Sequence, residues 1–286
     1  MSGSDEQTAP SASGPAPQSS GRPGGPAQRL YGYRVAVLGG GGVLGAAAAR
    51  ACGREGAAVA VGYRSSAGAA AAVADEITAG GGTAFAGSAD VTDARSVGGF
   101  IDAAADRLGG LDVLVNAFGR IDAADAVRFA QTTAAAWDEL FAVDVRGLLL
   151  ACQAALPHLR RSPVASIINF AGSYGNGSNP ENLVNSVSVS FCAAKGAVRG
   201  FTAALARDLA PHIRVNAVSP GMIEADWEAD WNIPAGHLDE AIGHTPLRRL
   251  GQPEEIAQTV VYLASAGGGY TTGQILQVDG GWVMPG

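Results

Sequence analysis

The chain of 286 residues has little charge and almost no lysine. Only 16% of its residues are charged, against roughly 25% in ordinary soluble domains. A single lysine, Lys195, stands beside 18 arginines. The net charge of -7 argues against a general nucleic-acid or membrane-surface binder. A chain that uses arginine almost everywhere keeps lysine where a compact, rotatable ammonium is needed, so Lys195 is a candidate functional residue.

Cysteine is also scarce, and the three that occur are scattered through apolar surroundings. Cys52, Cys152 and Cys192 predict small buried side chains in a reducing, cytoplasmic compartment rather than a disulfide framework or zinc site. The four histidines show no metal-ligand spacing, so we expect no metal. No run of about 18 uncharged apolar residues occurs, and we expect no transmembrane helix.

Large apolar side chains are nearly missing from the N-terminal segment. Residues 1–29 are mainly Ser, Pro, Gly, Ala and Gln, which cannot bury enough surface to offset the entropy of ordering the chain. The segment also lacks the basic start and apolar run of a secretory signal. We therefore predict a disordered, solvated tail over 1–29 and one domain over 30–286.

From Tyr33 onward, short apolar runs alternate with Ala-rich helical stretches. Strands are predicted over 34–38, 57–62, 83–87, 111–116, 165–170, 213–217 and 274–278. Helices are predicted over 46–54, 67–78, 94–108, 133–158, 189–209 and 253–264. This alternation is typical of a parallel sheet covered on both faces. Right-handed crossovers then give a doubly wound α/β Rossmann fold in a single domain.

The first strand runs into a glycine-rich turn that opens a helix. Gly40-x-Gly42-x-x-Gly45 fits the dinucleotide fingerprint, and Gly39-x-x-Gly42-x-x-Gly45 fits a related spacing. Without side chains, such a turn lets a pyrophosphate approach backbone N–H groups at a helix N-terminus. Because a strand precedes the turn and a helix follows it, we interpret it as a cofactor site rather than a flexible loop.

The second strand ends without the acidic residue that binds the adenosine ribose diol in NAD enzymes. Arg64 can bind a phosphate there, and Ser65 can donate a hydrogen bond. The sequence therefore favours NADP(H) over NAD(H), although a surface arginine after a strand would give the same pattern.

Several ordered motifs make residues 33–282 resemble the short-chain dehydrogenases/reductases. They are Asp90-Val91, Asn116-Ala117-Phe118-Gly119, Ser219-Pro220-Gly221, Gly251-Gln252-Pro253 and Thr272-Gly273-Gln274. The resemblance implies that the cofactor is bound by Gly39, Gly42, Leu44, Gly45, Arg64, Ser65, Asp90, Val91, Asn116, Ala117, Gly119, Lys195, Pro220, Gly221 and Ile223.

The resemblance also implies a catalytic tetrad of Asn, Ser, Tyr and Lys, of which only Lys195 is present. Phe191 stands four residues before it, where the family has the tyrosine that donates the proton. Asp144 stands at the Asn position and Gly172 at the Ser position. Because Phe191 has no hydroxyl, ordinary ketone or alcohol chemistry is not expected. Lys195 can still bind the ribose hydroxyls of the cofactor.

Three side chains are candidate replacements for the missing acid–base group. Asp144 is a carboxylate expected near Lys195, where an ion pair and a catalytic role are equally good interpretations. Tyr174 could bring its phenol to the position of Phe191 or lie exposed on a loop. Ser173 could supply the oxyanion contact if the preceding strand slips by one residue.

Residues 222–250 are expected to cover the substrate as a lid. Trp227 and Trp231 are spaced i, i+4 among four acidic residues, which suits a flat, apolar ligand and also a cationic one. A solvated amphipathic helix would show the same pattern. Gly172 is expected to face the substrate from the other side.

Three functions fit these residues. The first is NADP(H)-dependent reduction of an iminium or a conjugated C=C. The excess of Ala, Gly and Arg suggests a high-GC bacterium, in which such an enzyme would serve natural-product biosynthesis. The second is a non-redox cyclase, dehydratase or isomerase on the same scaffold, and the third is a catalytically silent NADP(H)-binding protein. The resemblance further implies a homotetramer, with the helices over 133–158 and 189–209 at one interface and the C-terminal strand at another.

Overall fold

The computed structural model describes residues 28–119, 129–176, 189–226 and 235–284. Its strands are β1 (Arg34–Leu38), β2 (Ala58–Tyr63), β3 (Thr83–Ser88), β4 (Val113–Asn116), β5 (Ser166–Phe170), β6 (Arg214–Pro220) and β7 (Ile275–Val278). Its main helices are α1 (Val43–Arg54), α2 (Ala67–Ala79), α3 (Ala94–Leu108), α4 (Ala134–Phe141), α5 (Gly147–Leu159), α6 (Val189–Leu209), α8 (Ala235–His244) and α9 (Pro253–Ala264).

These strands form one parallel sheet in the order β3-β2-β1-β4-β5-β6-β7. The order reverses direction at β1, which is the doubly wound topology predicted from the alternation of strands and helices. In this topology the crevice beyond the carboxyl ends of β1 and β4 is where ligands bind. The fold therefore confirms the predicted class and fixes where the site must lie.

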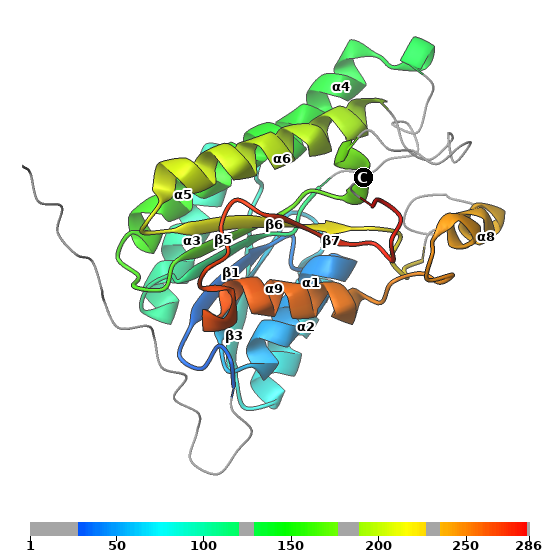
Figure 1. Ribbon diagram of the computed structural model, residues 1–286. Coiled ribbons are helices and arrows are strands. Elements are labelled where there is room, and N and C mark those ends of the chain that lie inside the picture. The colour runs from blue at the N-terminus through cyan, green and yellow to red at the C-terminus, as the bar shows by residue number, and fades with distance from the viewer. Residues whose placement is uncertain (1–27, 120–128, 177–188, 227–234, 285–286) are drawn as a thin grey trace, which may run out of the picture.

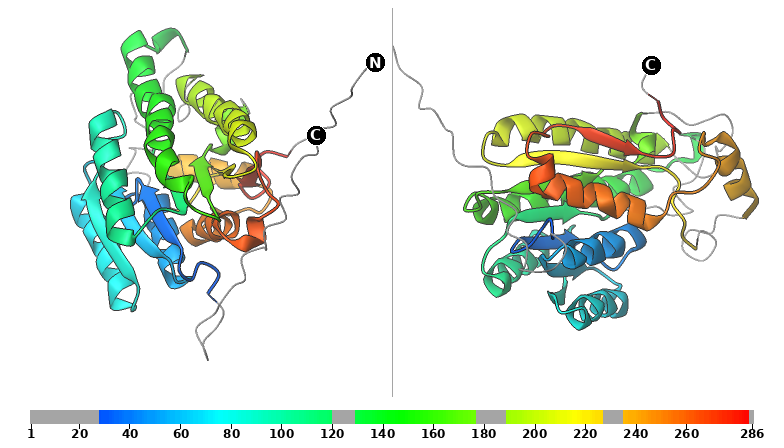
Figure 2. Two further views of the ribbon diagram at one scale, coloured as in Figure 1. Left: turned by 90° about the vertical axis from the view of Figure 1, so that its left-hand side faces the viewer. Right: turned by 60° about the horizontal axis from the view of Figure 1, so that its bottom comes forward.

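Helices cover both faces of the sheet, which is why its strands are apolar on both sides (Figure 1). Along β1, Val35 and Val37 pack against the layer of α1, α2 and α9. Ala36 and Leu38 alternate with them and pack against the layer of α3, α5 and α6. Helix α8 projects beyond the sheet at the carboxyl end of β6 (Figures 1 and 2).

Helices α4 and α5 join through a π-helical turn, Ala142–Arg146, into one run of 26 residues. Among the described residues, this run alone is long and apolar enough to cross a membrane by length and composition. Leu148 and Ala155 are buried against α3 and the sheet, so one side of the run belongs to the hydrophobic core. The sequence predicted one continuous helix at this place and missed the π-turn, a feature that often marks a functional site.

The cysteines lie partly as expected. Cys52 and Cys152 are buried, and burial raises the pKa of both thiols to about 12. Cys192 is only half-buried, at the start of α6.

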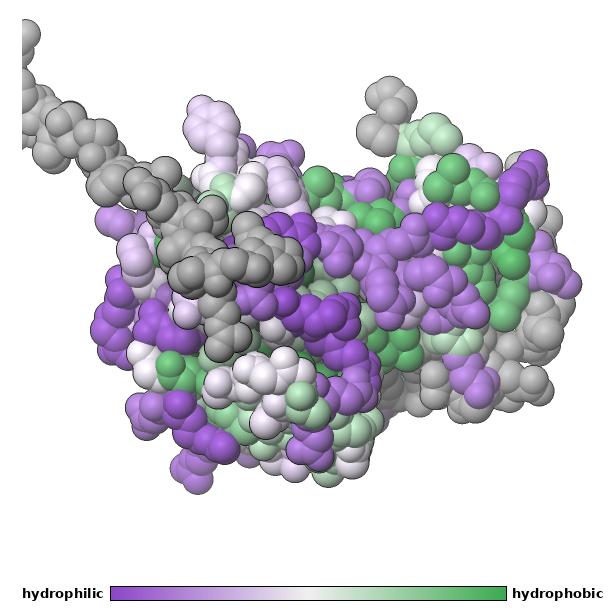
Figure 3. All heavy atoms as spheres, turned by 90° about the horizontal axis from the view of Figure 1, so that it is seen from below, coloured by the Kyte–Doolittle hydropathy of each residue, from purple (hydrophilic) through white to green (hydrophobic). Residues whose placement is uncertain are grey.

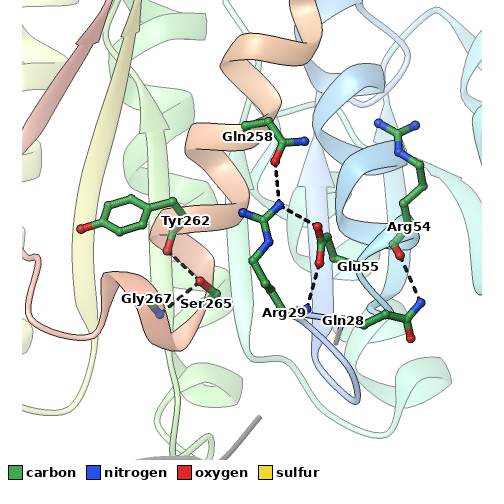
Figure 4. A network of polar contacts seen from close by, with 8 residues as sticks. All are labelled: Gln28, Arg29, Arg54, Glu55, Gln258, Tyr262, Ser265 and Gly267. Carbon is green, nitrogen blue, oxygen red and sulfur yellow. Dashed lines mark hydrogen bonds and ion pairs between the residues drawn. The ribbon is translucent and has the colours of Figure 1, made fainter. Parts of the chain in front are cut away.

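The chain enters the domain through a clasp at Gln28 and Arg29 (Figure 4). The Arg29 guanidinium donates at 2.6 Å both to Glu55 at the end of α1 and to Gln258 in α9. The Gln28 amide donates to the carbonyl of Arg54 at 3.1 Å. These contacts hold Gln28 and Arg29 on the domain, whereas the sequence assigned both to the tail, and residues 1–27 lie outside the described residues.

Seen from the side of α1, α2 and α9, the surface is mainly hydrophilic (Figure 3). Hydrophobic side chains gather on it toward the end of the molecule that carries α8 (Figure 3). Leu247 and Met284, both strongly exposed, follow α8 and the last strand respectively.

Candidate active site

The glycine-rich turn between β1 and α1 is packed so tightly that a side chain at either of two of its positions would collide with backbone atoms. A Cβ on Gly39, whose φ is +79°, would lie 2.5 Å from the carbonyl oxygen of Ala117. A Cβ on Gly45, in the first turn of α1 beside Leu44, would lie 2.2 Å from the carbonyl oxygen of Gly39. The turn therefore brings bare backbone and the N-terminus of α1 to the carboxyl edge of the sheet.

A cavity of about 770 Å³ opens beside this turn, at the carboxyl ends of β1, β2 and β4. Of the residues predicted to bind the cofactor, it is lined by Gly39, Gly42, Arg64, Ser65, Val91, Ala117 and Gly119. It is also lined by Ser66, Thr92 and Phe118, which lie within or beside the predicted motifs, and by residues that the sequence did not single out: Tyr63, Ala89, Glu139, Ala142, Val143 and Arg146. The last four come from α4 and the π-turn, which no local motif connects to the glycine-rich turn.

The end of β2 gives the cavity a basic and hydroxyl-rich corner. Arg64 and Ser65 are exposed there, and a Cβ on Gly41 would lie 2.2 Å from Ser66 Oγ, so this corner adjoins the glycine-rich turn. Asp90 does not line the cavity. Its Oδ1 accepts hydrogen bonds from the backbone and side chain of Thr92, which together with the nearby Arg64 hold its pKa below the usual value.

These observations fit a phosphorylated dinucleotide. The volume lies within the range of small-molecule sites, roughly 300–1,000 Å³, and the turn offers backbone where a pyrophosphate must approach closely. The corner at Arg64 and Ser65 offers a cation and a donor where a second phosphate would be recognised.

The second part of the site is a buried ion pair between α6 and the π-turn. Lys195 Nζ lies 2.8 Å from Asp144 Oδ2, and both side chains are almost inaccessible. The ammonium also donates to the carbonyl oxygen of Phe170 at 3.4 Å. A Cβ on Gly119 would lie 3.0 Å from Lys195 Nζ, so the cofactor cavity and the ion pair share a wall. Of the two interpretations left open for Asp144, the ion pair is present, and it leaves a catalytic role open.

Phe191 lies one helical turn before Lys195 and is buried. Its ring centroid is 5.4 Å from Lys195 Nζ. Gly172 faces the same lysine, because a Cβ there would lie 3.8 Å from Lys195 Cγ. The structure thus brings Lys195, Asp144, Phe191 and Gly172 together, as the sequence predicted.

Ser173 does not occupy the oxyanion position. Its hydroxyl is fully buried and donates to Asp279 Oδ2 at 2.9 Å and to the carbonyl oxygen of Ser219 at 3.4 Å. The strand therefore does not slip by one residue, and Gly172 keeps the position beside the lysine. Ser173 instead ties the end of β5 to the segment that follows β7.

Tyr174 is neither exposed nor directed at Lys195. Its hydroxyl donates to Met222 Sδ at 3.2 Å. Its ring packs edge-on against Phe191, at 6.2 Å between centroids, and against Trp282, at 6.1 Å. Burial raises the pKa of the Tyr174 phenol well above its ordinary value, which makes it a poor acid. The alternative that Tyr174 lies exposed on a loop is therefore wrong, and in this structure its phenol is bonded to Met222 rather than placed at the position of Phe191.

The remaining predicted cofactor residues do not line the described cavity. Asn116 is buried and donates to Asn169 Oδ1 at 2.9 Å, which pins the ends of β4 and β5 together. Pro220 ends β6, and Gly221 N donates to the carbonyl oxygen of Val278 at 3.2 Å. Ile223 pairs with Gly251 across the base of the predicted lid.

Within that lid, helix α8 (Ala235–His244) is present. Trp227 and Trp231, the predicted substrate contacts, lie outside the described residues. In the described part of the chain, Trp282 packs edge-on against Tyr174, and Phe141 packs against the same cluster. No local sequence signal marked Trp282, because it follows the last strand and reaches the site only through the fold.

The sheet topology, the glycine-rich turn and the Lys195 position together define a Rossmann-fold oxidoreductase scaffold. A family model described as enoyl-(acyl carrier protein) reductase matches residues 42–283. An uncharacterized oxidoreductase of Methylorubrum extorquens is 38% identical over 255 residues, which cover 88% of this chain and 98% of that protein. The chain belongs to the short-chain dehydrogenase/reductase family.

Other relatives indicate the range of this family. The granaticin polyketide synthase putative ketoacyl reductase 2 of Streptomyces violaceoruber is 38% identical over 193 residues, 68% of this chain and 74% of that protein. A short-chain dehydrogenase of Burkholderia cenocepacia, solved in complex with NADP, superposes with a TM-score of 0.80 at 32% identity, covering 89% of this chain and 99% of that one. A blue fluorescent protein from a metagenomic library, solved with NADPH, gives a TM-score of 0.80 at 32% identity over 90% of this chain and 100% of that one.

Proposed function

We propose that the protein is an NADP(H)-dependent reductase whose acceptor is an iminium or a conjugated C=C rather than an ordinary ketone. The observation that carries the proposal is the buried Phe191 ring beside an ion-paired Lys195. In the described part of the chain, the partners of Lys195 Nζ are a carboxylate and a backbone carbonyl, and neither is a hydroxyl. The Streptomyces relative supports a place in bacterial natural-product biosynthesis.

The choice of NADP(H) is supported by the basic corner at Arg64 and Ser65 and by the NADP and NADPH complexes of similar proteins. The turn from Gly39 to Gly45 would hold the pyrophosphate on its backbone, and Val91 and Ala117 would flank the adenosine half. Lys195 would donate hydrogen bonds to the nicotinamide ribose. When bound, the cofactor supplies a hydride to the acceptor.

The residues of the site then decide which acceptors can react. A ketone oxygen gains negative charge as hydride arrives, and a positioned hydroxyl that protonates it is worth roughly 10²–10⁴-fold. Phe191 cannot donate, Ser173 is held by Asp279, and Tyr174 is held by Met222. An acceptor that needs no proton on oxygen reacts without this general acid, so its reduction is not slowed by the missing hydroxyl.

The test compares acceptors directly by the absorbance of NADPH. We expect oxidation of NADPH with iminium or enone acceptors and about a hundredfold less with ketones of the same shape. The variant Phe191→Tyr should raise ketone reduction at least about tenfold, because it returns a phenol beside Lys195. If the wild-type protein reduces ketones as fast as enones and iminium ions, the proposal is wrong.

A non-redox cyclase, dehydratase or isomerase is the second candidate, favoured by the buried Asp144 carboxylate, which could move a proton. It would form product without consuming hydride, and Asp144→Asn would then slow turnover more than it weakens cofactor binding. A silent NADP(H)-binding protein is the third candidate, and any turnover that depends on site residues excludes it.

A homotetramer is also proposed, from the family resemblance. Apolar side chains exposed on the two expected interface helices support it: Leu149 of α5 is 41% exposed and Val189 of α6 is 48% exposed.

A further inference from the structure

We propose that the substrate is a cationic iminium, selected by the Lys195–Asp144 ion pair together with an aromatic cluster of Phe191, Tyr174 and Trp282. This inference rests on the proposed reductase function and decides between the two acceptor classes that it allows.

The proton balance of the reaction favours the iminium. When a hydride adds to the carbon of a C=N⁺ group, the π electron pair becomes the lone pair of nitrogen, and a neutral amine leaves. No proton enters. A conjugated C=C needs a proton on its α-carbon, and a ketone needs one on its oxygen. In the described site the nearby hydroxyls of Ser173 and Tyr174 both donate to other partners. The iminium is therefore the acceptor that can react here without a proton donor.

The charges point the same way. A lone ammonium at Lys195 would repel a cationic substrate, and at close range in a protein this repulsion is strong. Asp144 Oδ2, 2.8 Å from Lys195 Nζ, places a balancing negative charge at that point.

The aromatic cluster lies beside Lys195, where its rings would favour a cationic substrate over a neutral one. Phe191 and Tyr174 pack edge to face, and Tyr174 packs in the same way on Trp282. The ring quadrupole attracts a cation that lies over the face of the ring. Met222 accepts the Tyr174 hydroxyl, which keeps this ring in place between the other two.

Ser173 acts as a positioning residue for Trp282. Its hydroxyl and the backbone N–H of Val283 both donate to Asp279 Oδ2, while Gly281 N donates to Oδ1. The carboxylate of Asp279 thereby fixes the turn that carries Trp282. The serine next to the expected catalytic position thus holds the turn that carries Trp282, and its hydroxyl is directed at Asp279 and not at an acceptor.

The experiment offers three acceptors of one ring size: an N-methylated cyclic iminium salt, the neutral cyclic enone and the cyclic ketone. The methyl group keeps the iminium charged at every pH. We expect kcat/KM for the iminium to exceed that for the enone at least about tenfold. Asp144→Asn should lower kcat/KM for the iminium at least about tenfold, mainly through KM, and change the enone value less.

Controls separate selectivity from folding. Asp102→Asn removes the same charge from the exposed face of α3 and should leave all three values unchanged. NADPH binding, measured by its fluorescence, should survive Asp144→Asn. Trp282→Leu and Ser173→Ala should each weaken the iminium preference, so the test does not depend on one variant.

The outcomes are distinct. If the enone is reduced faster than the iminium, the inference is wrong and the proposed reductase stands. If NADPH binds and none of the three acceptors is reduced, the proposed function itself is wrong. If Asp144→Asn folds, binds NADPH and lowers both acceptors equally, Asp144 is structural and the charge argument is overturned.

Discussion

Single residues at this site are constrained by backbone geometry as well as by chemistry. Gly172 has a φ of +64°, in the left-handed region where residues with a Cβ are strained. A Cβ would nevertheless meet nothing closer than 3.8 Å. A glycine rather than a serine at this position therefore matches the local backbone, and it also fits the proposed function.

The geometry of Gly172 predicts that Gly172→Ser lowers the free energy of unfolding by about 1–2 kcal/mol, because the cost of a left-handed residue is of that size. Urea unfolding measures it. Gly99→Ala is the matched control: Gly99 is exposed in α3 with nothing within 4 Å of its added Cβ. That variant should instead raise the free energy of unfolding by up to about 1 kcal/mol, because alanine favours the helix more than glycine does. Equal effects of the two variants would contradict the strain argument.

Arg64 decides the cofactor preference if the proposal is right. Arg64→Ala should weaken NADPH binding about ten- to hundredfold and leave NADH binding nearly unchanged, because only NADPH carries the extra phosphate. Calorimetry or cofactor fluorescence measures both. Arg95→Ala, an exposed arginine at the start of α3, is the control and should change neither. A uniform loss for both cofactors would assign Arg64 to the pyrophosphate instead.

The ends of a helix or strand could be predicted where the residues that set them are neighbours in the sequence. Helix α9 begins at Pro253 as predicted, because Gln252 and Glu255 form a capping box around that proline. Strand β6 runs three residues past its predicted end, because its last residues pair with β7, far away in the sequence. The π-turn around Asp144 was missed because one extra residue per turn hardly changes the apolar pattern.

The hydrogen bonds from Ser173 to Asp279 and from Tyr174 to Met222 depend on the tertiary fold. No local sequence pattern predicts them.

The amino-terminal edge of the sheet depends on one buried carboxylate, Asp112, just before β4. It accepts hydrogen bonds from Arg34 N, Nε and Nη2, and from Ser162 Oγ. Burial alone would raise the pKa of Asp112. The hydrogen bonds from Arg34 and Ser162 lower it by more than burial raises it, so the pKa lies below the ordinary value. Asp112→Asn should cost roughly 2–3 kcal/mol at neutral pH, because Arg34 loses its charged partner.

The pH dependence has a definite sign. Asp112 has a lower pKa in the folded protein than in the unfolded chain, where the value is about 3.9. It therefore stabilises the folded state fully when the pH is above the unfolded pKa, and this stabilisation is lost as the pH falls through the folded pKa. The difference in unfolding free energy between wild type and Asp112→Asn should therefore be constant from neutral pH to about pH 5 and shrink below about pH 4. Urea unfolding at several pH values measures it, and a difference that grows on acidification would contradict the sign.

The whole molecule has an apolar helix run whose outer side is not covered by the sheet. If the proposed tetramer forms through α4, α5 and α6, then Leu149→Arg should yield a smaller species in sedimentation or light scattering, because a charge at an interface core is costly. Ala72→Arg, on the exposed side of α2, is the matched control and should not change the mass. A monomeric wild type would end the tetramer proposal.

The clasp at Gln28 and Arg29 has a practical consequence. It fixes the point where the chain joins the domain at the amino-terminal ends of the strands, while the cofactor cavity opens at the opposite ends. The five residues of β1 alone separate the two edges by about 15 Å. A fusion partner or a solid support joined ahead of Gln28 should leave the cavity mouth open, so immobilisation by the N-terminus is the natural arrangement for a flow reactor.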